Sequence, residues 1–393
     1  MNCLLRNPST SIARATSAVS LFAFVLLVIL TQMAVAQGFS VLYDFSGGVD
    51  GKYPYSRLML VNGEVYGTTH EGGALGYGTI FKVNASGTET VLYSFAGSPD
   101  GAYPYAGLLH DAAGNLYGTT KAGGVSGYGT VFKLDANGTE SVLHSFGGGT
   151  DGASPYAGVI RDAVGNLYGT TSGGQPDSRY GTVFTIDSSG TETVLYGFTS
   201  TSDGGNPGGI LARDGAGNLY GTAGSGGVRD SGLVFKLDTE GIESALYTFS
   251  GKNGDPIGPS SGLIRDDQGN FYGTSIAGGT HRNGTVYRVN TKGRETVLYS
   301  FAGGSDGAGP SGELVLDSKG RLYGTTVAGG AANFGTVFML SGIGKEKVLY
   351  TFTGGADGGR PVAGLVRDAA GNLYGSASRG GKTNHGVIFK IKP

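Results

Sequence analysis

The heptapeptide GNLYGTT, residues 165–171, recurs along the chain with small variations. Its tyrosine appears seven times, as Tyr66, Tyr117, Tyr168, Tyr220, Tyr272, Tyr323 and Tyr374. The intervals between these tyrosines are 51, 51, 52, 52, 51 and 51 residues, so one unit of about 51 residues is copied seven times. Such a regular period predicts a fold that is built from equivalent units.

Each unit contains four stretches that favour β-strands. In residues 158–198 they are GVIRD, NLYGTT, GTVFTID and TETVLYGF, which are rich in β-branched and aromatic residues. Tight D-x-x-G turns join the first two strands, and turns such as DANGTE (135–140) join the third and fourth. The other connections are longer, as in AGGVSGYG (122–129) and GGGTDGASP (147–155). Tight and loose connections therefore alternate between opposite ends of a four-stranded antiparallel sheet.

Seven such sheets predict an all-β fold, a seven-bladed β-propeller. A β-solenoid is the alternative, but its coils are usually shorter and are not four-stranded. The first repeat-like sequence is FSVLYDF (39–45), which has the pattern of a fourth strand, and the last is GVIFKIK (386–392), which has the pattern of a third strand. We therefore expect strand 41–45 to complete the last blade and close the ring. The small Gly and Thr beside each repeated tyrosine are expected to let adjacent blades approach closely.

Residues 1–36 have the pattern of a secretory signal peptide. Arg6 and Arg14 precede the ten-residue apolar core LFAFVLLVIL (21–30), and AVA (34–36) provides small residues for cleavage. Ten apolar residues are too few to cross the roughly 30 Å hydrocarbon layer comfortably, so an uncleaved anchor is only the alternative. The sequence therefore predicts export, with no membrane insertion after cleavage.

The mature protein is expected to begin near Gln37, so that the propeller occupies 37–393. Cys3 is the single cysteine, and its loss with the signal leaves no disulfide, so strand pairing has to close the ring. The mature chain keeps 26 basic and 30 acidic residues, a formal charge of −4 without a basic run, which argues against nucleic-acid binding. We expect a secreted, extracellular or periplasmic monomer, with the cell surface as an alternative, and we expect no C-terminal sorting tail after the last strand.

The repeat resembles a known family. The phrases YGTT, GG..GYGTVFKLD..GTE and VLYSF.GG.DG..P..GL..D..GNLYG are similar to the GloVer tandem repeats of choice-of-anchor proteins, over residues 39–393. The resemblance implies export and a surface or extracellular setting, and it implies no activity. The unit is also similar to NHL and streptogramin-lyase propellers and to kelch repeats, although kelch units carry a Trp and this chain has none. Similarity of fold alone does not transfer function.

An aspartate followed four residues later by proline is the strictest polar repeat. Seven carboxylates in one ring of loops could hold Ca²⁺, since aspartate is among its preferred ligands. We favour the interpretation in which each aspartate caps its own turn, and we expect no cofactor. Asp255 supports this, because Pro256 replaces the glycine that follows the other aspartates. The candidate metal ligands are Asp50, Asp100, Asp151, Asp203, Asp255, Asp306 and Asp357.

Tyrosines are concentrated in the loose-end loops of the first three units. The matching positions of the later units are mostly small or polar, so one sector of that face is expected to be aromatic. Exposed tyrosine combines apolar area with a hydrogen-bonding tip, which suits a glycan or an extended peptide. Alternatively, the rings only cover glycine-rich loops and neighbouring blades. The candidate ligand-binding residues are Tyr53, Tyr55, Tyr77, Tyr103, Tyr105, Tyr128, Tyr156 and Tyr180.

Catalysis has one candidate group. His70 and His385 fall in loose-end loops of the first and seventh units, which adjoin in a closed ring, and Asp50 or Asp357 would lie nearby. Such a group would suit a lyase or hydrolase. The five histidines otherwise show no metal-ligand spacing. We expect a non-enzymatic binding or scaffold module for a glycan or protein, with an extracellular lyase or hydrolase as the alternative.

The first strands are expected to line the central axis, and their last residues differ between units. Five are basic and two are apolar. The basic side chains could form a ring for an anion, but we favour pairing with the aspartate that follows each of them. The seven residues are Met59, His110, Arg161, Arg213, Arg265, Leu316 and Arg367. The glutamates that precede the fourth strands, such as Glu295, are expected to keep the outer edges soluble.

Overall fold

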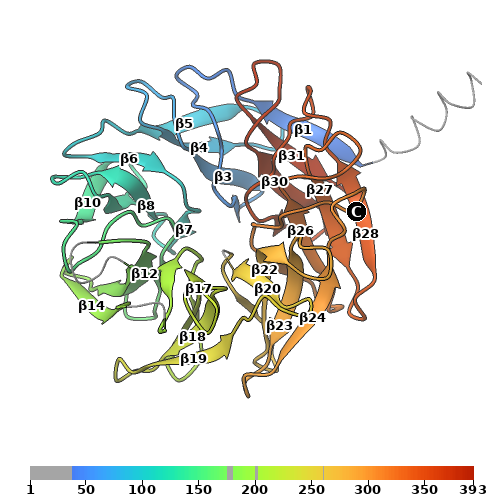
Figure 1. Cartoon of the computed structure of the whole chain (residues 1–393). Helices are drawn as coiled ribbons and strands as arrows, with labels where there is room; N and C mark the ends of the chain where they lie inside the picture. The colour runs from blue at the N-terminus through green and yellow to red at the C-terminus, as the bar shows by residue number, and fades with distance from the viewer. Residues whose placement is uncertain (1–37, 175–179, 200–201, 260) are drawn as a thin grey trace, which may run out of the picture.

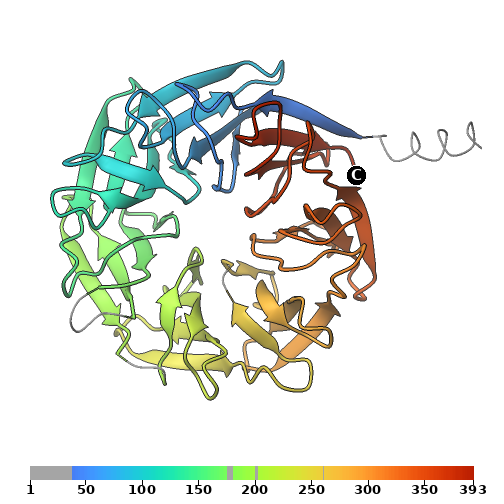
Figure 2. The same ribbon diagram turned by 45° about the horizontal axis from the view of Figure 1, so that its top comes forward.

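The computed structural model describes residues 38–174, 180–199, 202–259 and 261–393. These residues form seven antiparallel sheets around one axis, the predicted seven-bladed β-propeller (Figures 1 and 2). The predicted signal peptide lies outside the described residues. In the described part of the chain, no helix has the length and apolar character needed to span a membrane.

Each blade contains four strands in chain order from the axis outward. Blades one to three comprise β2 (Met59–Val61), β3 (Glu64–Thr69), β4 (Thr79–Val83) and β5 (Glu89–Ser94); β7 (Leu109–His110), β8 (Leu116–Gly123), β9 (Thr130–Leu134) and β10 (Glu140–Ser145); and β11 (Ile160–Arg161), β12 (Leu167–Thr171), β13 (Thr182–Ile186) and β14 (Glu192–Gly197). Blades four to six comprise β16 (Ala212–Arg213), β17 (Leu219–Ser225), β18 (Leu233–Leu237) and β19 (Glu243–Thr248); β21 (Ile264–Arg265), β22 (Phe271–Gly278), β23 (Thr285–Val289) and β24 (Glu295–Ser300); and β25 (Val315–Leu316), β26 (Leu322–Thr326), β27 (Thr336–Leu340) and β28 (Glu346–Thr351). Blade seven comprises β29 (Val366–Arg367), β30 (Leu373–Ala377), β31 (Val387–Ile391) and β1 (Phe39–Asp44).

The connection that leads into each blade also pairs with its second strand, which the four-strand unit did not predict. The short strands β6 (Gly101–Pro104), β15 (Gly205–Pro207) and β20 (Pro256–Pro259) pair with β8, β17 and β22. In the other blades a single bridge makes the same contact, as between Lys52 and Glu71. These pairings hold the loose-end loops against the blades and so fix the residues of that face.

β1 closes the ring, as the sequence predicted. It pairs antiparallel with β31, from Phe39 opposite Ile391 to Asp44 opposite Val387 (Figure 1). A β-bulge in β1 repeats the register shift of the other fourth strands. β1 is therefore a complete fourth strand, and it covers the edge that β31 would otherwise expose.

Phe39 distinguishes the closing strand from the other fourth strands. Those six strands begin with glutamate, whereas β1 begins with Phe39. The Phe39 ring stacks on Tyr350 of the sixth blade, with centroids 3.8 Å apart and planes inclined by 7°, and it also packs against Phe352 and Phe389. The closure therefore combines backbone hydrogen bonds with an aromatic anchor.

Two contacts inside each blade explain the repeated Tyr-Gly pair. The tyrosine hydroxyl donates to the carboxylate of the first tight turn, as from Tyr168 to Asp162 at 3.1 Å, and Glu64 accepts this bond in the first blade. A Cβ on Gly169 would lie 2.5 Å from the tip of the Phe184 ring on the paired strand. The prediction that this glycine lets adjacent blades approach closely was therefore wrong, because the glycine makes room for an aromatic ring of its own blade.

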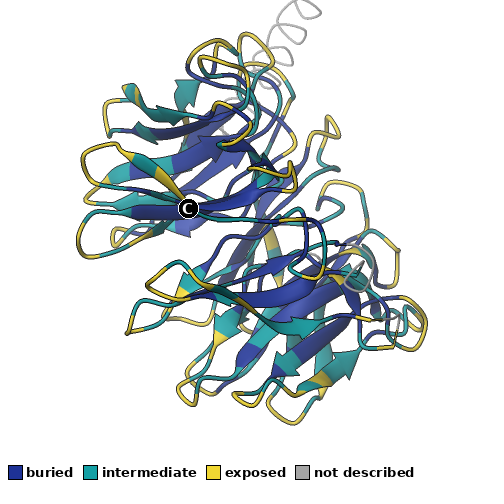
Figure 3. Cartoon of the chain, turned by 90° about the vertical axis from the view of Figure 1, so that its left-hand side faces the viewer, coloured by how far each residue is buried: buried dark blue, intermediate teal, exposed yellow. Residues whose placement is uncertain are grey.

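Neighbouring blades share one aromatic pair and one hydrogen bond, repeated around the ring. Phe146 packs edge-on against Phe184 of the next blade at 5.2 Å, and Phe45 and Phe81 make the same contact across the closure. The Thr119 hydroxyl donates to a backbone carbonyl of the next blade at 2.9 Å, as do its counterparts in five other blades. The core consists of seven clusters of this kind, with exposed loops at both ends (Figure 3).

The glutamates that begin the other fourth strands are not freely solvated, which corrects the sequence prediction. One carboxylate oxygen of each is buried and has no hydrogen-bond partner among the described residues. Burial, together with the nearby aspartate of the preceding connection, raises the pKa of each carboxyl to about 7. The six residues are Glu89, Glu140, Glu192, Glu243, Glu295 and Glu346.

Replacing Phe39 by alanine should weaken the closure. Loss of the stacked ring is expected to lower the free energy of unfolding by about 2–3 kcal/mol, somewhat less than for a fully buried phenylalanine. Chemical denaturation measures the change. Val41→Ala is the matched control, because Val41 lies on the same strand and is exposed. Equal stability of Phe39→Ala and Val41→Ala would contradict the anchoring role.

The buried glutamates should make the propeller less stable at pH 8 than at pH 5. Glu295, for example, has a pKa of about 7 in the folded protein, raised from 4.5. Its contribution to stability is complete below pH 4.5, where the carboxyl is protonated in both the folded and the unfolded state, and is lost as the pH rises through 7. His70 and His144 act in the opposite sense below pH 6.5, because burial lowers their pKa values. Thermal melting should therefore show a smaller loss from pH 5 to pH 8 for Glu295→Gln than for the natural protein. An identical loss in both proteins would disprove this.

Candidate functional site

The segment after each repeated proline runs along the axis. The residues one position after the prolines form a first level around the axis, and those three positions after the prolines form a second level. The first level surrounds a recess of about 100 Å³ at the loose end of the axis. The second level narrows the axis, and below it a cavity of about 520 Å³ opens at the tight-turn end. The described residues of the first level are Tyr55, Tyr105, Tyr156, Gly208, Ser311 and Val362.

An aromatic cluster, here called the tyrosine mouth, lies on the side of blades one to three. The Tyr55 and Tyr105 rings stack with centroids 5.0 Å apart, and Tyr105 meets Tyr156 edge-on at 5.4 Å. Tyr53 continues the row, 6.4 Å from Tyr55. The opposite wall carries small side chains, so the predicted aromatic sector is present and borders the recess. The tyrosine mouth comprises Tyr53, Tyr55, Tyr103, Tyr105, Tyr156 and His70.

His70 lies inside this cluster. Its ring is 5.3 Å from the rings of both Tyr55 and Tyr103, and 6.0 Å from that of Tyr105. Burial lowers the pKa of His70, and the backbone of Pro104 acts weakly in the opposite direction. The imidazole is therefore neutral near pH 7, and its Nδ1 is buried with no partner among the described residues.

Backbone conformation sets two of these tyrosines apart. Tyr53 and Tyr103 have φ values of 57° and 58°, in the left-handed region that glycine and asparagine adopt more readily. All seven blades have this conformation at the residue before the repeated proline, and the other five residues are Ser154, Asn206, Gly258, Gly309 and Arg360. A bulky residue in this conformation costs about 1–2 kcal/mol. The two tyrosines are thus present despite a backbone preference for other residues.

Two cations flank the tyrosine mouth. The Arg379 guanidinium lies 4.4 Å from the centre of the Tyr53 ring, and the Lys121 ammonium lies 5.1 Å from that of Tyr156. Lys52 also approaches Tyr53, but it forms an ion pair with a neighbouring glutamate at 2.9 Å. The rim of the tyrosine mouth is therefore cationic.

The other three candidate tyrosines have mainly a covering role. Tyr128 is exposed and lies over Gly148, where an added Cβ would be 2.4 Å from its ring. Tyr180 covers Gly205 in the same way. Tyr77 covers a loop glycine too, and its ring lies 5.7 Å from Tyr103 at the edge of the tyrosine mouth. The tyrosines that line the recess therefore remain candidates for ligand binding, whereas Tyr128 and Tyr180 cover glycine-rich loops.

The predicted catalytic group is not assembled. Tyr53 separates the two histidines, because its backbone N–H donates to the His385 carbonyl and its carbonyl accepts from the His70 N–H. Asp50 accepts hydrogen bonds from Ser46 and Tyr43 in its own turn. Asp357 is held in the same way by the turn of the seventh blade. No contact joins the two imidazoles in the part of the chain that the structure describes.

The seven repeated aspartates cap their own turns. Each accepts a backbone N–H from the second residue after the fourth strand, as Asp100 does from Ala96 at 2.7 Å. In six blades a tyrosine hydroxyl also donates to the aspartate, and in the third blade His144 lies 3.6 Å from Asp151. Among the described residues, no three His, Cys, Asp or Glu side chains are placed to share a metal ion.

The sequence analysis predicted that the arginines at the ends of the first strands pair with the aspartates that follow them. Among the described residues, the structure does not show this pairing. Arg161 instead lies over the ring of Tyr117 in the preceding blade at 5.9 Å, and Arg213 lies over Tyr168 at 5.6 Å. The aspartates are occupied by turn donors; Asp162, for example, accepts from the Asn166 side chain. Arg367 lies over Tyr323 of the preceding blade and Arg265 over Phe271 of its own blade, so all four arginines pack against aromatic rings.

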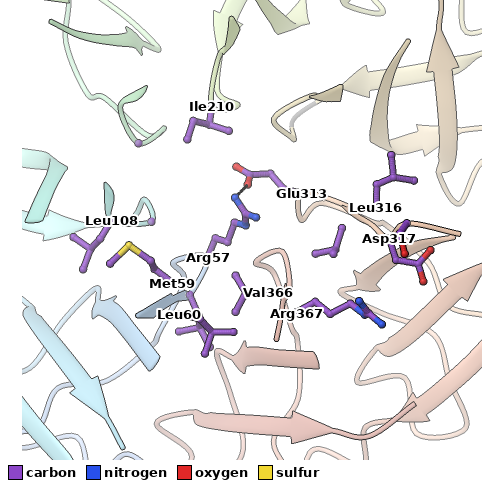
Figure 4. Close-up of a pocket in the computed structure, with 15 residues that line it drawn as sticks. Arg57, Met59, Leu60, Leu108, Ile210, Glu313, Leu316, Asp317, Val366 and Arg367 are labelled. Atoms are coloured by element: carbon purple, nitrogen blue, oxygen red, sulfur yellow. Dashed lines mark ion pairs between the residues drawn. The ribbon is translucent and has the colours of Figure 1, made fainter. Parts of the chain in front are cut away.

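The second level contains a cross-axis ion pair that the sequence analysis did not identify. Four blades have glycine at this level, and the other three have Arg57, Ile210 and Glu313. Arg57 Nη1 lies 3.1 Å from Glu313 Oε2, which links blades one and six across the axis (Figure 4). The signal that could have revealed these residues was the replacement of a glycine repeated three residues after each proline.

The chain matches the model of the Gloeobacter/Verrucomicrobia repeat over residues 28–216 and 210–393. It belongs to this repeat family. Membership confirms the resemblance to GloVer repeats that the sequence motifs indicated. No curated protein matches the sequence.

Two solved structures share the propeller fold with this member of the repeat family. One is the extracellular domain of a putative one-component system from B. thetaiotaomicron, with a TM-score of 0.58 and 10% identity over 90% of this chain. The match spans 40% of that longer chain. The other is a putative 6-phosphogluconolactonase from Bacteroides uniformis, with a TM-score of 0.53 and 16% identity over 80% of this chain and 88% of that chain. At these identities the similarity shows the fold alone.

Proposed function

We propose that this protein is an exported, non-enzymatic module that binds a glycan through the tyrosine mouth. The observation that carries the proposal is the one-sided arrangement of the first level. Tyr55, Tyr105 and Tyr156 form an aromatic crescent beside the recess, and the facing side chains are small. A sugar ring has apolar C–H faces and a hydroxyl edge, and partly exposed tyrosines offer both an aromatic face and a hydroxyl.

The dimensions favour a glycan over a folded protein surface. The recess of about 100 Å³ accepts one pendant group, while the sugar ring itself rests across the crescent. Tyr53 and Tyr103 support a binding role, because they place a bulky aromatic residue at a left-handed position where blades five and six have glycine. Lys121 and Arg379 add charged donors at the rim.

Export is supported by the signal-peptide pattern of residues 1–36. Expression in a bacterial host with the leader intact should therefore release a protein whose N-terminal residue, by sequencing, is Gln37 or lies near it. A protein that retains residues 1–36 and remains in the cytoplasm would contradict export.

Loss of the crescent should remove glycan binding. Screening of the mature protein on a glycan array identifies a ligand, and calorimetry then compares the natural protein with a Tyr105→Ala, Tyr156→Ala double variant. We expect the double variant to bind at least about tenfold more weakly, as is usual for aromatic residues at the centre of a site. Phe334→Ala is the matched control, because Phe334 is an exposed aromatic residue of the sixth blade, outside the cluster.

Thermal melting of each variant separates loss of binding from loss of folding. Tyr105→Phe with Tyr156→Phe keeps the rings and removes the hydroxyls, and we expect an intermediate affinity. Equal affinity of the natural protein and the folded alanine variant would overturn the proposal. So would binding to extended peptides with no binding to any glycan.

A further inference from the structure

The cavity of about 520 Å³ at the tight-turn end adjoins the recess beside the tyrosine mouth, and the two share Arg57, Ile210 and Glu313 in their linings. The cavity lies on the other side of the Arg57–Glu313 ion pair and receives side chains from blades one, two, four, six and seven. Figure 4 shows apolar side chains surrounding this pair. Its volume falls in the usual range for small-molecule sites, roughly 300–1,000 Å³.

The wall of this cavity is apolar because blades one and six depart from the repeat. Met59 and Leu316 occupy the position at which the other blades carry arginine or histidine. Leu60 stands where the other six blades have the turn aspartate. Leu108 and Val366 extend the same surface. The cavity therefore offers an apolar wall against which the body of a ligand could be buried.

Arg57 is an incompletely satisfied cation at the floor of the cavity. Its Nη1 faces Glu313 at 3.1 Å, but its Nε is shielded from solvent and has no hydrogen-bond partner among the described residues. A buried donor without a partner is costly, by about 1–3 kcal/mol. The Arg57 side chain is 39% exposed and that of Glu313 is 17% exposed, so the guanidinium is the more accessible of the two groups.

The lining has two other charged groups, Asp317 and Arg367, and the Nε of Arg367 is likewise buried without a hydrogen-bond partner among the described residues. Asp317 accepts hydrogen bonds from the Arg321 side chain at 2.8 Å and from the Tyr323 hydroxyl at 3.2 Å. Arg367 lies over the Tyr323 ring at 6.0 Å, and in Figure 4 its guanidinium points away from Glu313. Arg57 is therefore the cation that faces the interior of the cavity.

We propose that this cavity is a second binding site, which takes a small organic anion with an apolar body and a terminal carboxylate. A small rotation of the Arg57 side chain, whose Nε is shielded in the free protein, brings its Nε and Nη2 edge to the carboxylate, while Nη1 stays near Glu313. This edge of a guanidinium matches the two oxygens of a carboxylate, and the contact supplies the acceptor that Nε lacks. The apolar body lies against Met59, Leu60 and Leu316. Glu313 repels the ligand and so limits its affinity.

Octanoate tests this site, with 1-octanol as the neutral probe of equal length. Calorimetry on the mature full-length protein should show one octanoate bound, with 1-octanol at least about tenfold weaker. Three variants introduce the residue most common at the same position in the other blades, which favours correct folding: Arg57→Gly, Glu313→Gly and Leu316→Arg. Arg294→Gln is the control, because Arg294 is exposed in an outer hairpin turn.

Arg57→Gly should weaken octanoate binding at least about tenfold, Leu316→Arg should weaken it because the apolar contact of Leu316 is lost, and Glu313→Gly should strengthen it several-fold. Arg294→Gln should bind as the natural protein does. Melting curves confirm that each variant is folded. The proposal is overturned if octanoate does not bind at millimolar concentration, if 1-octanol binds equally well, or if folded Arg57→Gly keeps full affinity. Glycan binding concerns the other end of the axis, so either proposal can fail without the other.

Discussion

The pairing of β1 with β31 is the contact on which this ring is built. A blade can bury its two faces only between two neighbours, and a circle of seven supplies them only if the ends of the chain meet. The main-chain ladder makes that junction, and Phe39 reinforces it by stacking on Tyr350 of the sixth blade. In the other six blades a tight turn connects the third strand directly to the fourth, so a glutamate is tolerated at the start of the fourth strand. The closing strand lacks that turn and uses an aromatic ring.

Repetition and deviation have different meanings in this molecule. Features present in every blade serve the blade: the repeated tyrosine closes a tight turn, its glycine admits a phenylalanine ring, and the aspartate before each proline caps a connection. Features found in one sector need another explanation. The aromatic crescent, the Arg57–Glu313 pair and the apolar residues Met59 and Leu316 all interrupt the repeat, and all lie along the axis. The axis is the one place where side chains from all blades converge, so a change in a single blade is enough to shape a site.

The two ends of the axis differ in chemistry because separate levels of the same segment face them. At the loose end, tyrosine hydroxyls and flanking cations surround a shallow recess, which suits a hydroxylated ligand. At the tight-turn end, aliphatic side chains surround a deeper space with one available guanidinium, which suits an amphipathic anion. The four glycines of the second level bring the backbones close together, and the three larger side chains of that level complete the partition.

The sequence by itself determined the number of blades, the strands of each blade and the closure by 41–45, because period, turn chemistry and strand pattern are local properties that seven copies make unambiguous. It also located the aromatic sector, since comparison of the units shows where tyrosine is added. Only the tertiary structure decided which tyrosines meet, that Tyr53 separates His70 from His385, and that the glutamates before the fourth strands are buried. It alone revealed the ion pair across the axis. Those outcomes depend on distances between blades, and such distances are set by packing around the closed ring, which no single unit of the sequence contains.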